Sequence, residues 1–125
     1  MKANNIRITI KSRAQVLHEF GETVEKLRKG EPASQRDELS FSSLESLRKA
    51  LTEKRTELLK AIKEKSPESV YELAKLVGRD LKSVNTDLKI LKSLGLVSLR
   101  KSNEGRARVK PIVEFDKLNI EFALA

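Results

Sequence analysis

The chain has 125 residues, of which 38% are hydrophobic, so it is long enough for one compact domain with extensions. It contains no cysteine, which excludes disulfides, thiolate metal sites and a cysteine nucleophile. The formal net charge is +8, and residues 51–111 carry fifteen Lys and Arg against eight Asp and Glu, whereas the remainder sums to +1. Because a concentrated positive field attracts polyanions, nucleic acid is the leading expected partner and an anionic membrane surface the second.

Other function classes have less support in the sequence. His18 is the only histidine, and without partner groups we expect it to have a structural role. We find no glycine-rich phosphate loop, metal-ligand cluster or nucleophile with an identifiable base, so we expect no enzyme activity, metal or cofactor. The opening residues lack the apolar core of a signal peptide, and no apolar run could span a bilayer, so we expect a cytoplasmic protein.

The first 40 residues predict a strand, a helix and a connector. Isoleucines alternate with polar residues over 6–10, which is the period of a half-buried strand. Helical spacing follows from Ser12, an expected N-cap, to Gly30. The apolar stripe of this helix consists of Val16, Leu17, Phe20, Val24 and Leu27. Residues 31–40 are polar and contain Pro32, so they predict a connector.

Two helices are predicted between residues 42 and 66. Ser42 and Glu45 match a capping box, which starts a short helix that reaches about Ala50. Thr52 can cap a further helix, and Pro67 stops it. The apolar stripe of the second helix is Leu58, Leu59 and Ile62. The pattern leaves open whether these are two helices or one bent helix.

Residues 69–124 predict two more helices, a hairpin and a strand. A capping box begins a helix at Ser69, and Gly78 ends it. The next helix covers 80–94, between Asp80 as N-cap and Gly95, with its apolar face on Leu81, Val84, Leu88 and Leu91. Residues 97–101 and 106–110 flank a turn at 102–105 and predict a basic β-hairpin.

The alternating residues 120–124 predict a last strand that pairs with 6–10, within one chain or across a dimer. Such a pair would turn one apolar row from each strand inward. The rows are Ile6, Ile8 and Ile10, and Ile120, Phe122 and Leu124.

Residues 52–113 resemble a known family of regulators. The resemblance is carried by Glu72-Leu73-Ala74, Gly78, Val84, Leu88, Leu91 and Gly95-Leu96-Val97. Together these are similar to the winged helix-turn-helix signature of MarR- and ArsR-type bacterial and archaeal regulators. Phe41, Leu51-Thr52, Arg55, Leu58-Leu59, Val70, Arg79-Asp80 and Asp87 extend the likeness to small predicted prokaryotic regulators described as MarR-like or antitoxin-like.

The resemblance implies a mainly α protein with a small β component (α+β) that binds double-stranded DNA as a homodimeric transcriptional regulator. With the residue pattern outside the resemblance, this predicts three segments: a strand-helix extension over 1–40, a winged helix-turn-helix domain over 41–113, and a terminal strand over 114–125. The apolar stripe of the extension either forms a dimer interface, which we favour, or packs back on the core.

The expected DNA-binding residues lie on the 80–94 helix and the hairpin. By similarity, Lys82, Ser83, Asn85 and Thr86 contact base edges, whereas Lys89 and Lys92 contact phosphate. Arg79 either contacts phosphate or pairs with Asp87. In the hairpin, Arg106 is the expected tip contact to the minor groove or backbone. The other hairpin cations are Arg100, Lys101, Arg108 and Lys110.

Rival interpretations of these features remain open. An ordinary solvated helix face and a charged hairpin that avoids edge pairing would have the same pattern. A protein-interaction adaptor, or an antitoxin-type winged helix that binds a partner, is the alternative function. RNA binding is less favoured, because Tyr71 is the only aromatic residue in the basic segment available for stacking.

Overall fold

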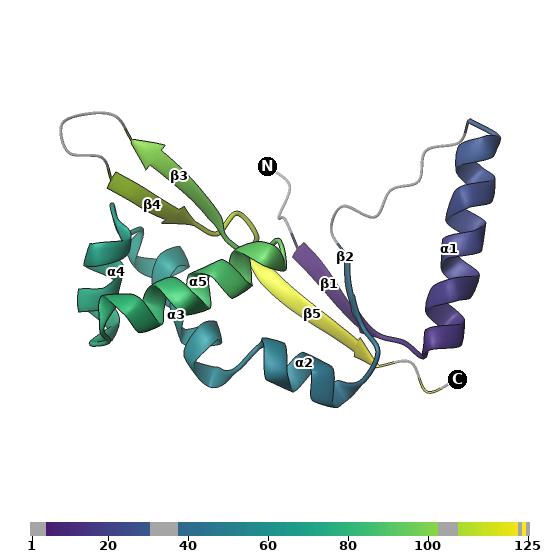
Figure 1. The fold of residues 1–125 in the computed structure, drawn as a ribbon, viewed down its shortest axis with the longest axis horizontal. Coiled ribbons are helices and arrows are strands. Elements are labelled where there is room, and N and C mark those ends of the chain that lie inside the picture. The colour runs from purple at the N-terminus through teal and green to yellow at the C-terminus, as the bar shows by residue number, and fades with distance from the viewer. Residues whose placement is uncertain (1–4, 31–37, 103–107, 123, 125) are drawn as a thin grey trace. The chain divides into compact units, whose positions relative to one another are not determined.

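The computed structural model describes residues 5–30, 38–102, 108–122 and 124 as a mixed α+β chain. It divides into two compact units (Figure 1). Unit 1 comprises residues 1–49 and 117–125, and unit 2 comprises residues 50–116. The sequence placed the corresponding boundaries at 40 and 113. The structure differs because residues 41–49 and the last strand belong with the N-terminal sheet.

Unit 1 is built on a three-stranded parallel sheet in the order β2-β1-β5. Its elements are β1 (Asn5–Ile10), α1 (Arg13–Arg28), β2 (Glu38–Phe41), α2 (Leu44–Ala50) and β5 (Lys117–Phe122). The predicted pairing of the two end strands is confirmed within one chain, with Ile8 opposite Ile120.

Strand β2 corrects the prediction that residues 31–40 form only a connector. It pairs in parallel with β1, with Ile8 opposite Leu39. Four residues carry too short an alternation to be distinguished from a loop, and their pairing with β1 is a tertiary effect. The N-cap of α2 is also one residue later than predicted: the Oγ of Ser43, not Ser42, accepts from the Ser46 N–H at 3.1 Å.

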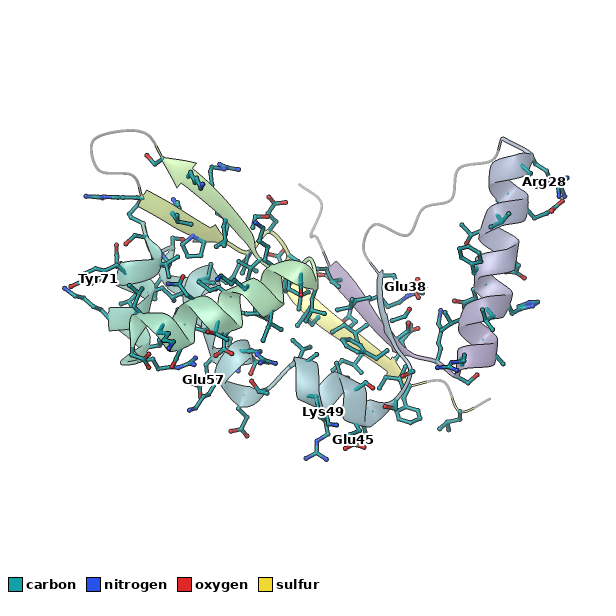
Figure 2. All side chains as sticks on the ribbon, viewed as in Figure 1. Arg28, Glu38, Glu45, Lys49, Glu57 and Tyr71 are labelled. Carbon is teal, nitrogen blue, oxygen red and sulfur yellow. The ribbon has the colours of Figure 1, made fainter. Side chains whose placement is uncertain are left out.

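One face of the sheet carries a polar network centred on Glu38 (Figure 2). Its carboxylate accepts hydrogen bonds from Arg7 at 3.0 Å, Thr9 at 3.1 Å and Lys11 at 2.9 Å. The amino group of Lys11 also donates to Glu19 of α1 at 2.7 Å. Partial burial raises the pKa of Glu38, but the hydrogen bonds from Lys11, Arg7 and Thr9 outweigh it and lower that pKa to about 2. Glu38 therefore stays ionised in all but strongly acidic solution.

The opposite face of the sheet is apolar but unevenly covered. Ile8 is fully buried and Ile10 is 4% exposed. The prediction that the last strand also turns its row inward is wrong, because Ile120 is 57% exposed and Phe122 is 53% exposed, and Leu124 beyond the strand is 91% exposed. Strand β1 has a neighbour on both sides, whereas β5 lies at the sheet edge.

In its described residues, unit 2 consists of three helices and an antiparallel hairpin, whose labels can be followed in Figure 1. The helices are α3 (Glu53–Lys65), α4 (Val70–Val77) and α5 (Leu81–Ser93), and the strands are β3 (Ser98–Ser102) and β4 (Arg108–Ile112). The hairpin is confirmed, with Arg100 opposite Lys110. The helix α3 contacts α4, α5 and β4, and α4 also contacts α5 and β4.

Local capping fixes where these helices start and end. The side chains of Thr52, Ser69 and Asp80 accept from backbone N–H groups of the first turns of α3, α4 and α5, as predicted. Gly78 has φ of +66° and turns the chain from α4 into α5. A side chain at this position would be strained, so a glycine is favoured here.

The core of unit 2 lies between the three helices. Leu58, Leu73, Val84, Leu88 and Leu91 are all fully buried. Ala74 is 5% exposed at the α4 side of this core. The predicted buried stripe of α5 is confirmed at its last three positions but not at its first, as the next subsection describes.

No helix in the described part of the chain is both long and apolar enough to cross a membrane.

A paired substitution tests the uneven covering of the unit 1 sheet. Ile8→Ala should lower the free energy of unfolding of this unit by about 2 to 5 kcal/mol, because it leaves a cavity in the centre of the sheet. The register partner Ile120 is more than half exposed, so Ile120→Ala should cost less than half as much. Urea unfolding followed by circular dichroism measures both, and equal losses would contradict the arrangement.

Candidate functional site

An open groove of about 770 Å³ runs between the α4–α5 pair and the hairpin within unit 2. We call it the basic groove. Its lining is Ser69, Val70, Tyr71, Glu72 and Lys75 of α4 and its cap, Leu81, Asn85 and Lys92 of α5, and Leu99, Lys101, Arg108 and Val109 of the hairpin. Residues from three separate elements therefore meet on one surface.

The charge of the basic groove is strongly positive. Lys75, Lys92, Lys101 and Arg108 are all exposed and line it, against a single acid, Glu72. Among the described residues, none of these four cations forms an ion pair within the chain. Their charge is thus available to an anionic partner.

Four of the sequence-predicted site residues come together in this groove: Asn85, Lys92, Lys101 and Arg108. Asn85 is exposed, so its amide can donate and accept hydrogen bonds with a partner. The predicted contact Arg106 lies outside the described residues. Arg100 is exposed on β3 but does not line the groove.

The remaining predicted residues of α5 are Lys82, Ser83, Thr86 and Lys89, and they do not line the groove. Lys82, Thr86 and Lys89 are exposed. The hydroxyl of Thr86 donates to the Lys82 carbonyl at 3.0 Å, which leaves its oxygen as an acceptor. The hydroxyl of Ser83 donates to Asp80 at 2.7 Å, so this side chain is already used in the N-cap.

Asp87 joins α5 to the rest of unit 2 through two arginines. Its carboxylate accepts from Arg79 Nη2 at 2.6 Å and from Arg55 Nε at 3.0 Å, and all three side chains are less than a fifth exposed. Arg55 also donates to the Ala50 carbonyl at 2.9 Å. Of the two alternatives stated for Arg79, the structure contains the ion pair. Arg79 Nη1 is buried and has no hydrogen-bond partner among the described residues.

The arginines of this cluster offset the negative charge that Asp87 brings to α5. Partial burial raises the pKa of Asp87, but the hydrogen bonds from Arg79 and Arg55 outweigh it, so the pKa lies below its ordinary value. The two arginines more than balance the carboxylate, so the cluster carries net positive charge. Asp87 therefore does not oppose an anion at the exposed face of α5.

Tyr71, Lys75 and Leu81 are among the groove residues that were not predicted as site residues. Tyr71 is 60% exposed and projects outward from α4 (Figure 2). The amino group of Lys75 lies 4.7 Å from the centre of its ring, a cation–π arrangement. Leu81 was assigned to the buried stripe of α5, but it is 43% exposed and lines the groove. The helical period places Leu81 near the face of Val84 and Leu88, but the sequence gives no sign that the hairpin stands opposite it.

Among the described residues, no group of three or more His, Asp or Glu side chains could hold a metal ion. Residues 50–120 match the model of the HVO_A0114 protein family, which spans all the groove residues and continues into β5. No curated protein and no solved structure matches the chain. The family name states no activity, and the basic groove is the feature of the chain that bears on its function.

Removing the charge of Asp87 should destabilise unit 2. Asp87→Asn leaves two partly buried guanidinium groups without their anion, and we expect a loss of about 1 to 3 kcal/mol in the free energy of unfolding near neutral pH. Since folding lowers the pKa of Asp87, its contribution is full above the unfolded pKa of about 3.9 and is lost as the pH falls through the folded pKa. The difference between wild type and variant should therefore shrink on acidification.

Urea unfolding at several pH values measures this difference. Asp116→Asn is the matched control, because Asp116 pairs with Lys63 at 3.1 Å but is 49% exposed, and it should change stability by less than about 0.5 kcal/mol. A gap between wild type and Asp87→Asn that stays constant down to pH 2 would show that the charge of Asp87 is not its cause.

Proposed function

The chain belongs to the HVO_A0114 family, and we propose that its unit 2 is a winged helix-turn-helix that binds double-stranded DNA, which makes the protein a transcriptional regulator. The observation that carries the proposal is the basic groove: four exposed cations without an ion-pair partner among the described residues, contributed by a helix pair and a hairpin. In this proposal α5 is the recognition helix and the β3–β4 hairpin is the wing.

The arrangement of α5 supports a position in the major groove of DNA. Its buried side holds it on the core through Val84, Leu88 and Leu91, and Asp87 fixes it to Arg55 and Arg79. The exposed side carries short polar groups and lysines, and the major groove, about 12 Å wide, admits one helix. Asn85 and Thr86 would contact base edges, while Lys82 and Lys89 would reach base edges or the backbone.

The wing cations support contact with the phosphate backbone. Lys101 of β3 and Arg108 of β4 line the basic groove together with Lys92 of α5. A DNA strand held between α5 and the hairpin would neutralise cations from both sides. Such contacts orient a protein on the duplex without specifying sequence.

Unit 1 supports a homodimer. Val16, Phe20 and Val24 are spaced by four residues on one face of α1, and they are 40%, 66% and 39% exposed. An apolar stripe of this kind can pack against the same stripe of a second copy of the chain in a two-fold symmetric dimer, in which both subunits use the same surface. We propose that α1 forms this interface and places two copies of α5 on one duplex.

The proposal predicts a steep salt dependence of binding. If a dimer makes about 6 to 10 phosphate contacts, affinity for duplex DNA should fall on the order of 10³ to 10⁵-fold between 50 and 200 mM salt. Fluorescence anisotropy with a duplex selected from random sequences measures this. A flat salt response, or no binding to any selected duplex by folded protein, would favour the partner-binding alternative instead.

The groove cations should account for part of that slope. The slope of log K against log salt is negative. Lys101→Ala combined with Arg108→Ala should reduce its magnitude by about 0.9 for each phosphate that the variant no longer neutralises. Lys60→Ala with Lys65→Ala removes the same charge from exposed positions of α3 that do not line the groove, and the slope should change much less. If both pairs of substitutions reduce the magnitude of the slope equally, the groove is not the binding surface.

The dimer proposal has its own test. Phe20→Glu introduces a charge into the apolar face of α1, so sedimentation velocity should show a shift from dimer toward monomer. Lys26→Glu adds a negative charge on a different face of the same helix and should leave the dimer intact. A wild-type protein that sediments as a monomer at micromolar concentration would contradict the interface.

A further inference from the structure

Leu81 is an exposed leucine at a position where a solvated helix would favour a polar residue. It is the first residue of α5, immediately after the N-cap Asp80, and 43% of it is exposed. The three later members of its predicted stripe are fully buried. Leu81 instead faces the basic groove together with Asn85, one turn further along α5.

The surroundings of Leu81 in the groove are mixed. Tyr71, Leu99 and Val109 add apolar surface, and the four cations described above border it. A polyanion that also offers an apolar group would satisfy both parts of this lining. DNA offers one such group at its base edges, the 5-methyl of thymine in the major groove, and apolar side chains contact it in preference to the other bases.

Resting on the proposed function, we propose that Leu81 recognises the 5-methyl group of a thymine in the bound duplex, with Tyr71 adding apolar surface to the same groove. Asn85, four residues on, is about 6 Å further along the helix axis, a distance comparable to two base-pair steps of about 3.4 Å each. Its amide suits the N6 and N7 positions of adenine. The bound half-site should thus contain a thymine and, within about two base pairs, an adenine.

Deoxyuridine provides a direct test, because it differs from thymidine only by the missing methyl group. Each thymine of a duplex selected with the full-length protein is replaced in turn by deoxyuridine, and affinity is measured by fluorescence anisotropy. At one position per half-site we expect wild-type affinity to fall about fourfold, which corresponds to one buried methyl group. With Leu81→Ala the same replacement should have no effect.

Leu76→Ala is the matched control, because Leu76 lies on α4 with 48% exposure and does not line the groove. This variant should keep the wild-type response to deoxyuridine. If the selected duplex binds well but no replacement matters, or if Leu81→Ala retains the response, the thymine contact is wrong and the DNA-binding function stands. If the folded protein binds no duplex, both proposals fail together.

Discussion

The attachment of α5 to Arg55 and Arg79 through its own Asp87 is the constraint on which the rest of unit 2 depends. One carboxylate accepts hydrogen bonds from Arg55 in α3 and from Arg79 in the turn before α5. Helices α3 and α5 and the turn between α4 and α5 therefore share a polar contact in addition to the leucine and valine core, and the orientation of α5 about its own axis is fixed. That orientation decides which residues are buried, which face the groove and which remain on the exposed side.

The features that sequence could predict are those determined by neighbouring residues. Ser69, Asp80 and Gly78 act on the backbone within a few positions, so the ends of α4 and α5 follow from local chemistry. The hairpin and the cations Lys101 and Arg108 were predictable for the same reason. The location of the basic segment was also predictable, because it follows from counting the charged residues along the sequence.

The features that the sequence did not predict depend on tertiary contacts, that is, on which element packs opposite a residue. Leu81 has the right spacing for the core, but it meets the groove instead of a helix. Tyr71 and Lys75 join the candidate site only because β4 packs against α4. Strand β2 is recognisable once its pairing with β1 is known, since four residues have no persistent period of their own. The exposure of Ile120 likewise follows from its place at a sheet edge.

The parallel pairing of β1 with β5 has a consequence for the order in which the protein acquires its structure. Asn5 is in register with Lys117, so along the sequence all residues of unit 2 come between two strands that pair with each other. The contacts within unit 2 are local enough to form while the chain is still emerging from the ribosome, whereas β1 has no partner in β5 until residue 117 has been made. During that interval β2 covers one edge of β1 while the edge that later pairs with β5 is open, so this is the period in which unit 1 is most exposed to mispairing with another strand.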